Sequence, residues 1–76
     1  MTYTKKLFAD ELLHQLSSGY DVVRIARWAF SIYMSHSREL ELGLKSEIMQ
    51  VVAMEEGPEF EMSEQELRQF ASHLLH

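Results

Sequence analysis

The sequence has no cysteine, only one proline and only three glycines among its 76 residues. Without cysteine there can be no disulfide and no thiolate zinc site, so apolar packing has to supply the stability. Because proline and glycine are scarce, few positions interrupt helices, and residues of high helix propensity are abundant. No stretch shows the period-two alternation of a strand. We therefore expect one all-α domain that spans residues 1–76.

Long apolar runs are also missing. The longest apolar-rich stretch, residues 22–34, contains Arg24 and Arg27 and is too short to cross a bilayer. Near the N-terminus, Asp10 and Glu11 directly follow the first apolar residues, which is not typical of a signal peptide. We therefore expect a soluble, cytoplasmic protein that does not bind membranes.

Positive charge is scarce in the second half of the chain, whose net charge as a whole is −5. Residues 1–38 hold five Lys or Arg and three Asp or Glu, a net charge of +2. Residues 39–76 hold two Lys or Arg and nine Glu, a net charge of −7. Because an acidic half repels phosphate backbones, we predict no direct binding of nucleic acid. The natural complement of this half is a basic protein surface.

Helical periodicity predicts a first helix over residues 4–17, ended at Gly19, and a second over residues 22–36, with Asp21 as its N-cap. The second helix is apolar almost all round. Its polar residues form one narrow stripe: Arg24, Arg27, Ser31 and Ser35. We therefore expect it to be the central helix of a small four-helix bundle, or to present spare apolar surface to another chain.

A third helix is predicted within residues 37–56, with a break near Gly43, because glycine destabilises a helix interior by about 1 kcal/mol relative to alanine. Gly57 and Pro58 end it. The fourth helix begins at a capping box, in which the Ser63 hydroxyl and the Glu66 carboxylate each accept a backbone N–H.

Six glutamates lie within twelve residues at the junction of the third and fourth helices, with no Lys or Arg among them: Glu55, Glu56, Glu59, Glu61, Glu64 and Glu66. One interpretation is a solvated loop with helix-capping carboxylates. The other is a surface that meets a cationic partner. Glu55 and Glu56 favour the second, because the helix dipole disfavours negative charge at a C-terminus and a positive partner would relieve it.

Pro58 and Phe60 lie inside this acidic segment, where proline stiffens the loop and phenylalanine supplies an apolar anchor. An aromatic residue with a charged rim is typical of a partner-binding hot spot. For Phe60 itself, however, we favour a place in the core. The candidate partner-binding residues are Glu55, Glu56, Glu59, Phe60, Glu61 and Glu64.

Motifs for catalysis and for metal binding are lacking. There is no phosphate loop and no nucleophile elbow, and a bundle of this size leaves little room for a water-excluding pocket, so we predict no catalytic residue, no cofactor and no enzyme activity. The acidic segment has no Asp and contains Pro58, unlike a calcium loop. His73 and His76 have i, i+3 spacing, but without a supporting motif we interpret them as exposed helix-end residues and predict no metal site.

From about residue 17 to residue 75, a Ser-Gly turn leads into an aromatic-rich apolar helix, and an acidic loop precedes a final capped helix. This order resembles the small helical immunity proteins of bacteria, including the colicin-like self-protective group. The resemblance implies a protein that binds and neutralises a cognate toxin, often a basic nuclease, through its acidic surface. The candidate residues named above come from charge clustering alone.

Two other functions fit the same sequence. The chain could be a self-associating structural or regulatory module, a homodimer through the apolar second helix. It could also be an acidic mimic of DNA that occupies the nucleic-acid groove of another protein.

Overall fold

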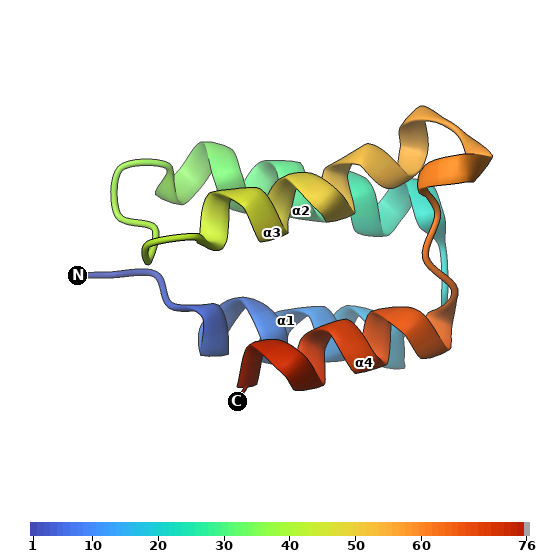
Figure 1. The fold of residues 1–76 in the computed structure, drawn as a ribbon, viewed down its shortest axis with the longest axis horizontal. Helices are drawn as coiled ribbons and strands as arrows, with labels where there is room; N and C mark the ends of the chain where they lie inside the picture. The colour runs from blue at the N-terminus through green and yellow to red at the C-terminus, as the bar shows by residue number, and fades with distance from the viewer. Residues whose placement is uncertain (76) are drawn as a thin grey trace.

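The computed structural model describes residues 1–75, and these residues form four α-helices in two layers (Figure 1). The helices are α1 (Lys5–Ser17), α2 (Val22–His36), α3 (Leu44–Val52) and α4 (Glu64–Leu75). Two short 3-10 helices, η1 (Ala53–Glu56) and η2 (Pro58–Phe60), follow α3. Within the layers α1 packs beside α4 and α2 packs beside α3. The predicted all-α four-helix fold is confirmed.

The hydrophobic core lies between the two layers and takes side chains from all four helices. Its largest fully buried members are Phe8, Leu12, Ile25, Leu44, Ile48, Val51, Met54 and Leu67. The ring of Phe8 on α1 stacks on the ring of Trp28 on α2, with centroids 5.0 Å apart and planes 14° apart. This contact joins the two layers and adds to the free energy of burial.

The first two helices each begin at an N-cap, of which the one at Asp21 was predicted. The Thr4 hydroxyl accepts the Leu7 N–H at 3.1 Å, and the Asp21 carboxylate accepts the Arg24 N–H at 3.0 Å. Each cap satisfies a backbone donor that has no partner within its helix. The first two helices therefore begin within one residue of their predicted positions.

Residues 37–43 are not helical, so the third helix occupies only the later part of the range predicted for it. Gly43 adopts a left-handed conformation with φ of 88°, which confirms the predicted break. The N-terminal segment holds this loop in place, because the Tyr3 N–H donates to the Glu39 carbonyl at 2.7 Å and the Glu41 N–H donates to the Tyr3 carbonyl at 2.9 Å. The Tyr3 ring also stacks on His36 with centroids 4.3 Å apart.

Helix α2 is not enclosed by the other helices, contrary to the expectation of a central helix. Its buried residues are Ile25, Ala26 and Ala29, whereas Val23, Phe30 and Met34 are exposed. With only two layers, each helix keeps one face toward solvent, and on α2 this face carries the apolar Val23, Phe30 and Met34 together with the exposed Arg27. Within residues 1–75, no helix is both long and apolar enough to cross a membrane.

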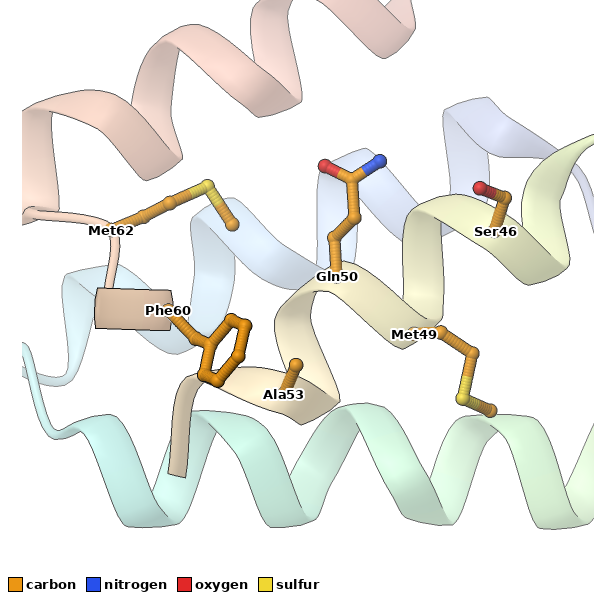
Figure 2. Close-up of a pocket in the computed structure, with 6 residues that line it drawn as sticks. All are labelled: Ser46, Met49, Gln50, Ala53, Phe60 and Met62. Carbon is orange, nitrogen blue, oxygen red and sulfur yellow. The ribbon is translucent and has the colours of Figure 1, made fainter. Parts of the chain in front are cut away.

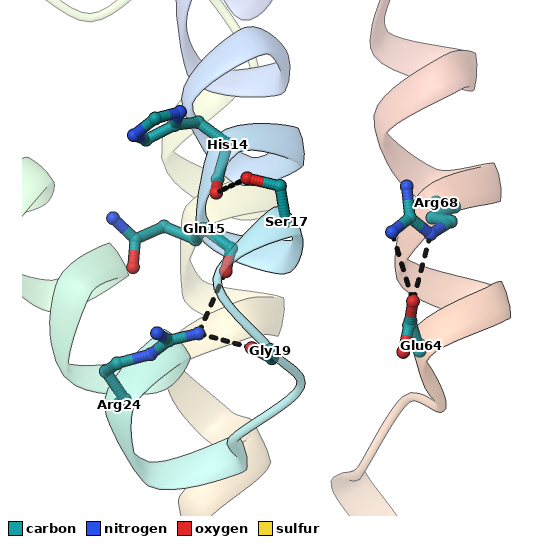
Figure 3. Close-up of polar contacts among 7 residues, drawn as sticks. All are labelled: His14, Gln15, Ser17, Gly19, Arg24, Glu64 and Arg68. Atoms are coloured by element: carbon teal, nitrogen blue, oxygen red, sulfur yellow. Dashed lines mark hydrogen bonds and ion pairs between the residues drawn. The ribbon is translucent and has the colours of Figure 1, made fainter.

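The polar stripe predicted along α2 is solvent-facing at Arg27 but not at Arg24. The Arg24 guanidinium donates to the carbonyls of Gln15 and Gly19, at the end of α1 (Figure 3). This arrangement arises because the short α1–α2 turn brings the start of α2 beside the last turn of α1. Arg24 thus adds a side-chain donor to the Gln15 carbonyl, which also accepts the Ser18 N–H at 3.2 Å, and to the Gly19 carbonyl just beyond α1.

The capping box at the start of α4 provides a direct test of local stability. Glu66 N–H donates to the Ser63 hydroxyl at 3.1 Å, and Ser63 N–H donates to the Glu66 carboxylate at 2.8 Å. We expect Ser63→Ala to lower the free energy of unfolding by about 1 kcal/mol, measured by urea denaturation. Ser72→Ala, at an exposed position inside α4, is the control and should change it by less than about 0.5 kcal/mol. Equal losses from both substitutions would contradict a capping role for Ser63.

Candidate functional site

The acidic segment lies at one end of the α2–α3 layer, where η1 and η2 turn the chain back toward α4 (Figure 1). All six of its glutamates, Glu55, Glu56, Glu59, Glu61, Glu64 and Glu66, are exposed to solvent. The structure therefore gathers at one end of the molecule the carboxylates that the sequence placed close together.

Three of these carboxylates have partners within the chain. The Glu55 carboxylate lies 3.7 Å from the Arg27 guanidinium on α2, and the Glu64 carboxylate lies 3.0 Å from that of Arg68 one turn along α4 (Figure 3). Glu66 takes part in the capping box. Both ion pairs are exposed, so each stabilises the fold by less than about 1 kcal/mol.

The other three carboxylates, those of Glu56, Glu59 and Glu61, form no ion pair with any residue that the structure describes. They follow one another along η1, η2 and the start of the connection to α4. The negative charge of the segment is therefore only partly balanced by the arginines of this chain. What remains is a negative surface that faces solvent.

Phe60 does not enter the core, so that expectation is wrong. Its side chain is 51% exposed, whereas Met54 on η1 and Leu67 on α4 are buried and belong to the core. Because these neighbouring elements already supply apolar side chains to the interior, the aromatic ring at the end of η2 lies outside it. The other interpretation of Phe60, an exposed apolar anchor among carboxylates, agrees with its exposure to solvent.

Phe60 instead forms one wall of an open groove along α3. The groove has a volume of about 450 Å³ and is lined by Ser46, Met49, Gln50, Ala53, Phe60 and Met62. Figure 2 shows the Phe60 ring beside Ala53, Met62 reaching toward α3, and Met49 directed toward α2. Its lining is mostly apolar, with the Ser46 hydroxyl and the Gln50 amide as polar groups.

Tyr20, in the turn between α1 and α2, forms a hydrogen bond with one residue of this groove. Its hydroxyl donates a hydrogen bond to the carbonyl of Met62, 42 residues further along the chain. Burial raises the pKa of the Tyr20 hydroxyl, and the negative charges of Glu61 and Glu66 raise it further, because they oppose a phenolate. Tyr20 thus links the fold of the first two helices to the acidic segment.

Sequence reasoning did not assign Tyr20, Met49 or Met62 to the site. Met49 lies one position beyond the buried Ile48 and so on a different face of α3. This offset from Ile48 was the sequence signal that could have placed Met49 outside the core. Nothing in the sequence indicates the contact between Tyr20 and Met62, which depends on the tertiary fold.

A second, more polar pocket of about 560 Å³ lies where the N-terminal segment meets α4, and it holds charges of both signs. It is lined by Thr4, Lys5, Lys6, Glu41, Glu47, His73, Leu74 and Leu75. Among residues 1–75 no group of three or more His, Asp or Glu side chains is placed to hold a metal ion. His73 is exposed. The other histidine of the i, i+3 pair, His76, lies outside the described residues.

Comparison of the chain with protein-family models, with curated proteins and with solved structures finds no match. The resemblance to immunity proteins therefore stays a prediction. The candidate partner-binding residues are supported only by their geometry in this structure.

Tyr20 reports the electrostatic potential of the acidic segment. We expect Glu61→Gln to lower the pKa of Tyr20 toward its usual value of about 10 without reaching it, because burial persists when the charge is removed. The pKa is measured by NMR titration of ¹³C-labelled tyrosine. Glu47→Gln removes the same charge from the start of α3 and should leave Tyr20 unchanged. Equal shifts from the two variants would contradict the local origin of the effect.

Proposed function

We propose that this chain is a non-catalytic binding protein that captures a basic protein with the surface formed by η1, η2 and the start of α4. One observation carries the proposal. Glu56, Glu59 and Glu61 have no ion pair among the described residues, and they lie next to the half-exposed ring of Phe60.

The two kinds of group on this surface have separate physical roles. Unpaired carboxylates raise the rate at which a basic partner associates, and they select it against acidic proteins. An exposed aromatic ring buries a large apolar area at little cost in side-chain entropy, so it slows dissociation. Together these groups favour a tight and selective protein complex.

The specific form of this proposal is an inhibitor of the immunity type, which neutralises a basic toxin such as a nuclease in the cytoplasm of a bacterium. The order of the helices and the acidic segment, in which the chain resembles such immunity proteins, supports it. A basic domain that acts on nucleic acid necessarily presents a cationic surface. An acidic protein that covers this surface would keep the substrate away.

The test is the affinity of this chain for a basic nuclease toxin domain encoded beside its gene, measured by calorimetry at low and at high salt. We expect the variant that combines Glu56→Gln, Glu59→Gln and Glu61→Gln to bind at least about tenfold more weakly at low salt, and its affinity to depend less on salt.

The matched control combines Asp10→Asn, Glu39→Gln and Glu47→Gln, which changes the net charge by the same amount at exposed or half-exposed positions outside the acidic segment. Its affinity should stay within about threefold of the original, because screening weakens distant charges. A tight complex that both triple variants preserve equally would refute the proposed surface.

Self-association is a second candidate function, and the outer face of α2 favours it. Val23, Phe30 and Met34 are 46%, 48% and 64% exposed, and their spacing places them on one face of the helix. Such a face would be covered in a symmetric dimer.

Analytical ultracentrifugation at high micromolar concentration tests this second candidate. If α2 forms the interface, the combined change Phe30→Ser and Met34→Ser should convert a dimer into a monomer, because it removes the apolar area that association buries. The control, Leu42→Ser, removes an apolar side chain that is 95% exposed in the loop before α3 and should leave the dimer intact. A strictly monomeric original protein would exclude this function.

A further inference from the structure

The groove beside the acidic segment is open on one side, as a binding groove for one secondary-structure element of a partner would be. Four of its residues have spacings of three and four and so share one face of α3 and its continuation into η1: Ser46, Met49 and Gln50 on α3, and Ala53 at the start of η1. The opposite face of α3 enters the core through Leu44, Ile48 and Val51. The floor of the groove is thus the outward side of a helix whose inward side is firmly packed.

The apolar lining of the groove is not covered by the chain itself. Phe60 is 51% exposed, and Met49 and Met62 are half-buried. Methionine side chains are flexible and polarisable, so they adapt to the shape of an inserted apolar side chain. The lining can therefore adjust to an inserted apolar side chain by changes in methionine side-chain conformation.

The charge around the groove determines the kind of partner. Between Lys45 and Arg68 the chain contains seven glutamates and no Lys or Arg. An anionic membrane or an acidic protein would be repelled, and a second copy of this chain would bring a net charge of −5 to an already acidic rim. A partner that carries apolar and basic residues together matches both the floor and the rim.

The backbone of the groove limits the conformation of that partner. Addition of an extended peptide to a sheet edge has no template here, because within residues 1–75 the only β pairing is the isolated bridge of Tyr3 with Leu40. From Ser46 on α3 to Ala53 at the start of η1 the floor covers seven residue steps, or about 10 Å. Two apolar side chains one turn apart on a partner helix are about 6 Å apart and fit within this length.

We propose, on the basis of the proposed function, that the groove lined by Met49, Ala53, Phe60 and Met62 binds a basic amphipathic helix of the partner protein. Apolar side chains at i and i+4 of that helix enter the groove. Lysines or arginines on its flanks lie against Glu56, Glu59 and Glu61, which adjoin the groove residues Phe60 and Met62 along the chain. This is the helix-in-groove mode of recognition, with an acidic rim that selects a cationic helix.

A synthetic peptide tests the groove without knowledge of the natural partner. The probe is a fluorescent 14-residue Leu/Lys peptide with leucines at i, i+3, i+4 and i+7, and its binding to the full chain is measured by fluorescence anisotropy. A peptide of the same composition, reordered so that it has no apolar face, is the ligand control. We expect the amphipathic peptide to bind at least about tenfold more tightly than the reordered one.

The chain offers a closely matched pair of variants. Phe60 and Phe30 are exposed to similar extents, 51% and 48%, but only Phe60 lines the groove. Phe60→Ala should weaken binding of the amphipathic peptide about tenfold or more, and Phe30→Ala should change it less than about twofold. Circular dichroism checks that both variants stay folded, as expected for exposed side chains.

The methionine methyl groups give an independent location for the bound peptide. In ¹³C-methyl NMR, the signals of Met49 and Met62 should shift as peptide is added, and the signal of the exposed Met34 on α2 should not. The inference is overturned if no peptide binds, if both peptides bind equally, if Phe60→Ala and Phe30→Ala have equal effects, or if Met34 shifts instead.

The same variants separate this inference from the proposed function. If a basic toxin domain binds through Glu56, Glu59 and Glu61 but Phe60→Ala leaves that affinity unchanged, the function stands and the groove inference fails. If the amphipathic peptide binds in the groove but the toxin domain does not bind, the groove inference stands and the proposed toxin-inhibitor function fails.

Discussion

Burial of apolar side chains between two pairs of helices is the interaction that holds this chain together, because it has no cysteine with which to form a disulfide. The stacked rings of Phe8 and Trp28 join the α1–α4 layer to the α2–α3 layer. The core uses only one face of each helix. In a chain of 76 residues the opposite faces meet solvent, so both the groove and the apolar face of α2 are consequences of the same two-layer packing.

The acidic segment depends on this packing for its position. Once α3 is fixed by Leu44, Ile48 and Val51, the chain leaves it through η1 and η2 and returns to α4 at the capping box. The hydrogen bond from Tyr20 to the Met62 carbonyl then ties this connection to the turn between α1 and α2. The backbone of a segment held at both ends is restrained, and in the proposed complex this restraint lowers the entropy lost on binding.

Much of the fold could be read from short-range patterns in the sequence. Asp21 and the capping box at Ser63 marked the starts of α2 and α4, and Gly43 marked the break before α3. Phe60 was assigned to the core because a large aromatic residue is usually buried. It lies outside because Met54 and Leu67, which come from neighbouring elements, are the residues buried there. No pattern within the acidic segment could show this.

The sequence by itself determined where α1, α2 and α4 begin and where the charge gathers, because caps, helical periodicity and charge clusters depend on residues within about four positions of each other. Only the tertiary structure decided which faces stay open and which carboxylates are paired. Arg27 on α2 forms an ion pair with Glu55 on η1, and the Tyr20 hydroxyl donates to the carbonyl of Met62, which is 42 residues away in the sequence. These contacts exist only after the helices have packed. Glu56, Glu59 and Glu61 remain unpaired within the described chain for the same reason, since the packed layers bring no arginine or lysine within ion-pair distance of them.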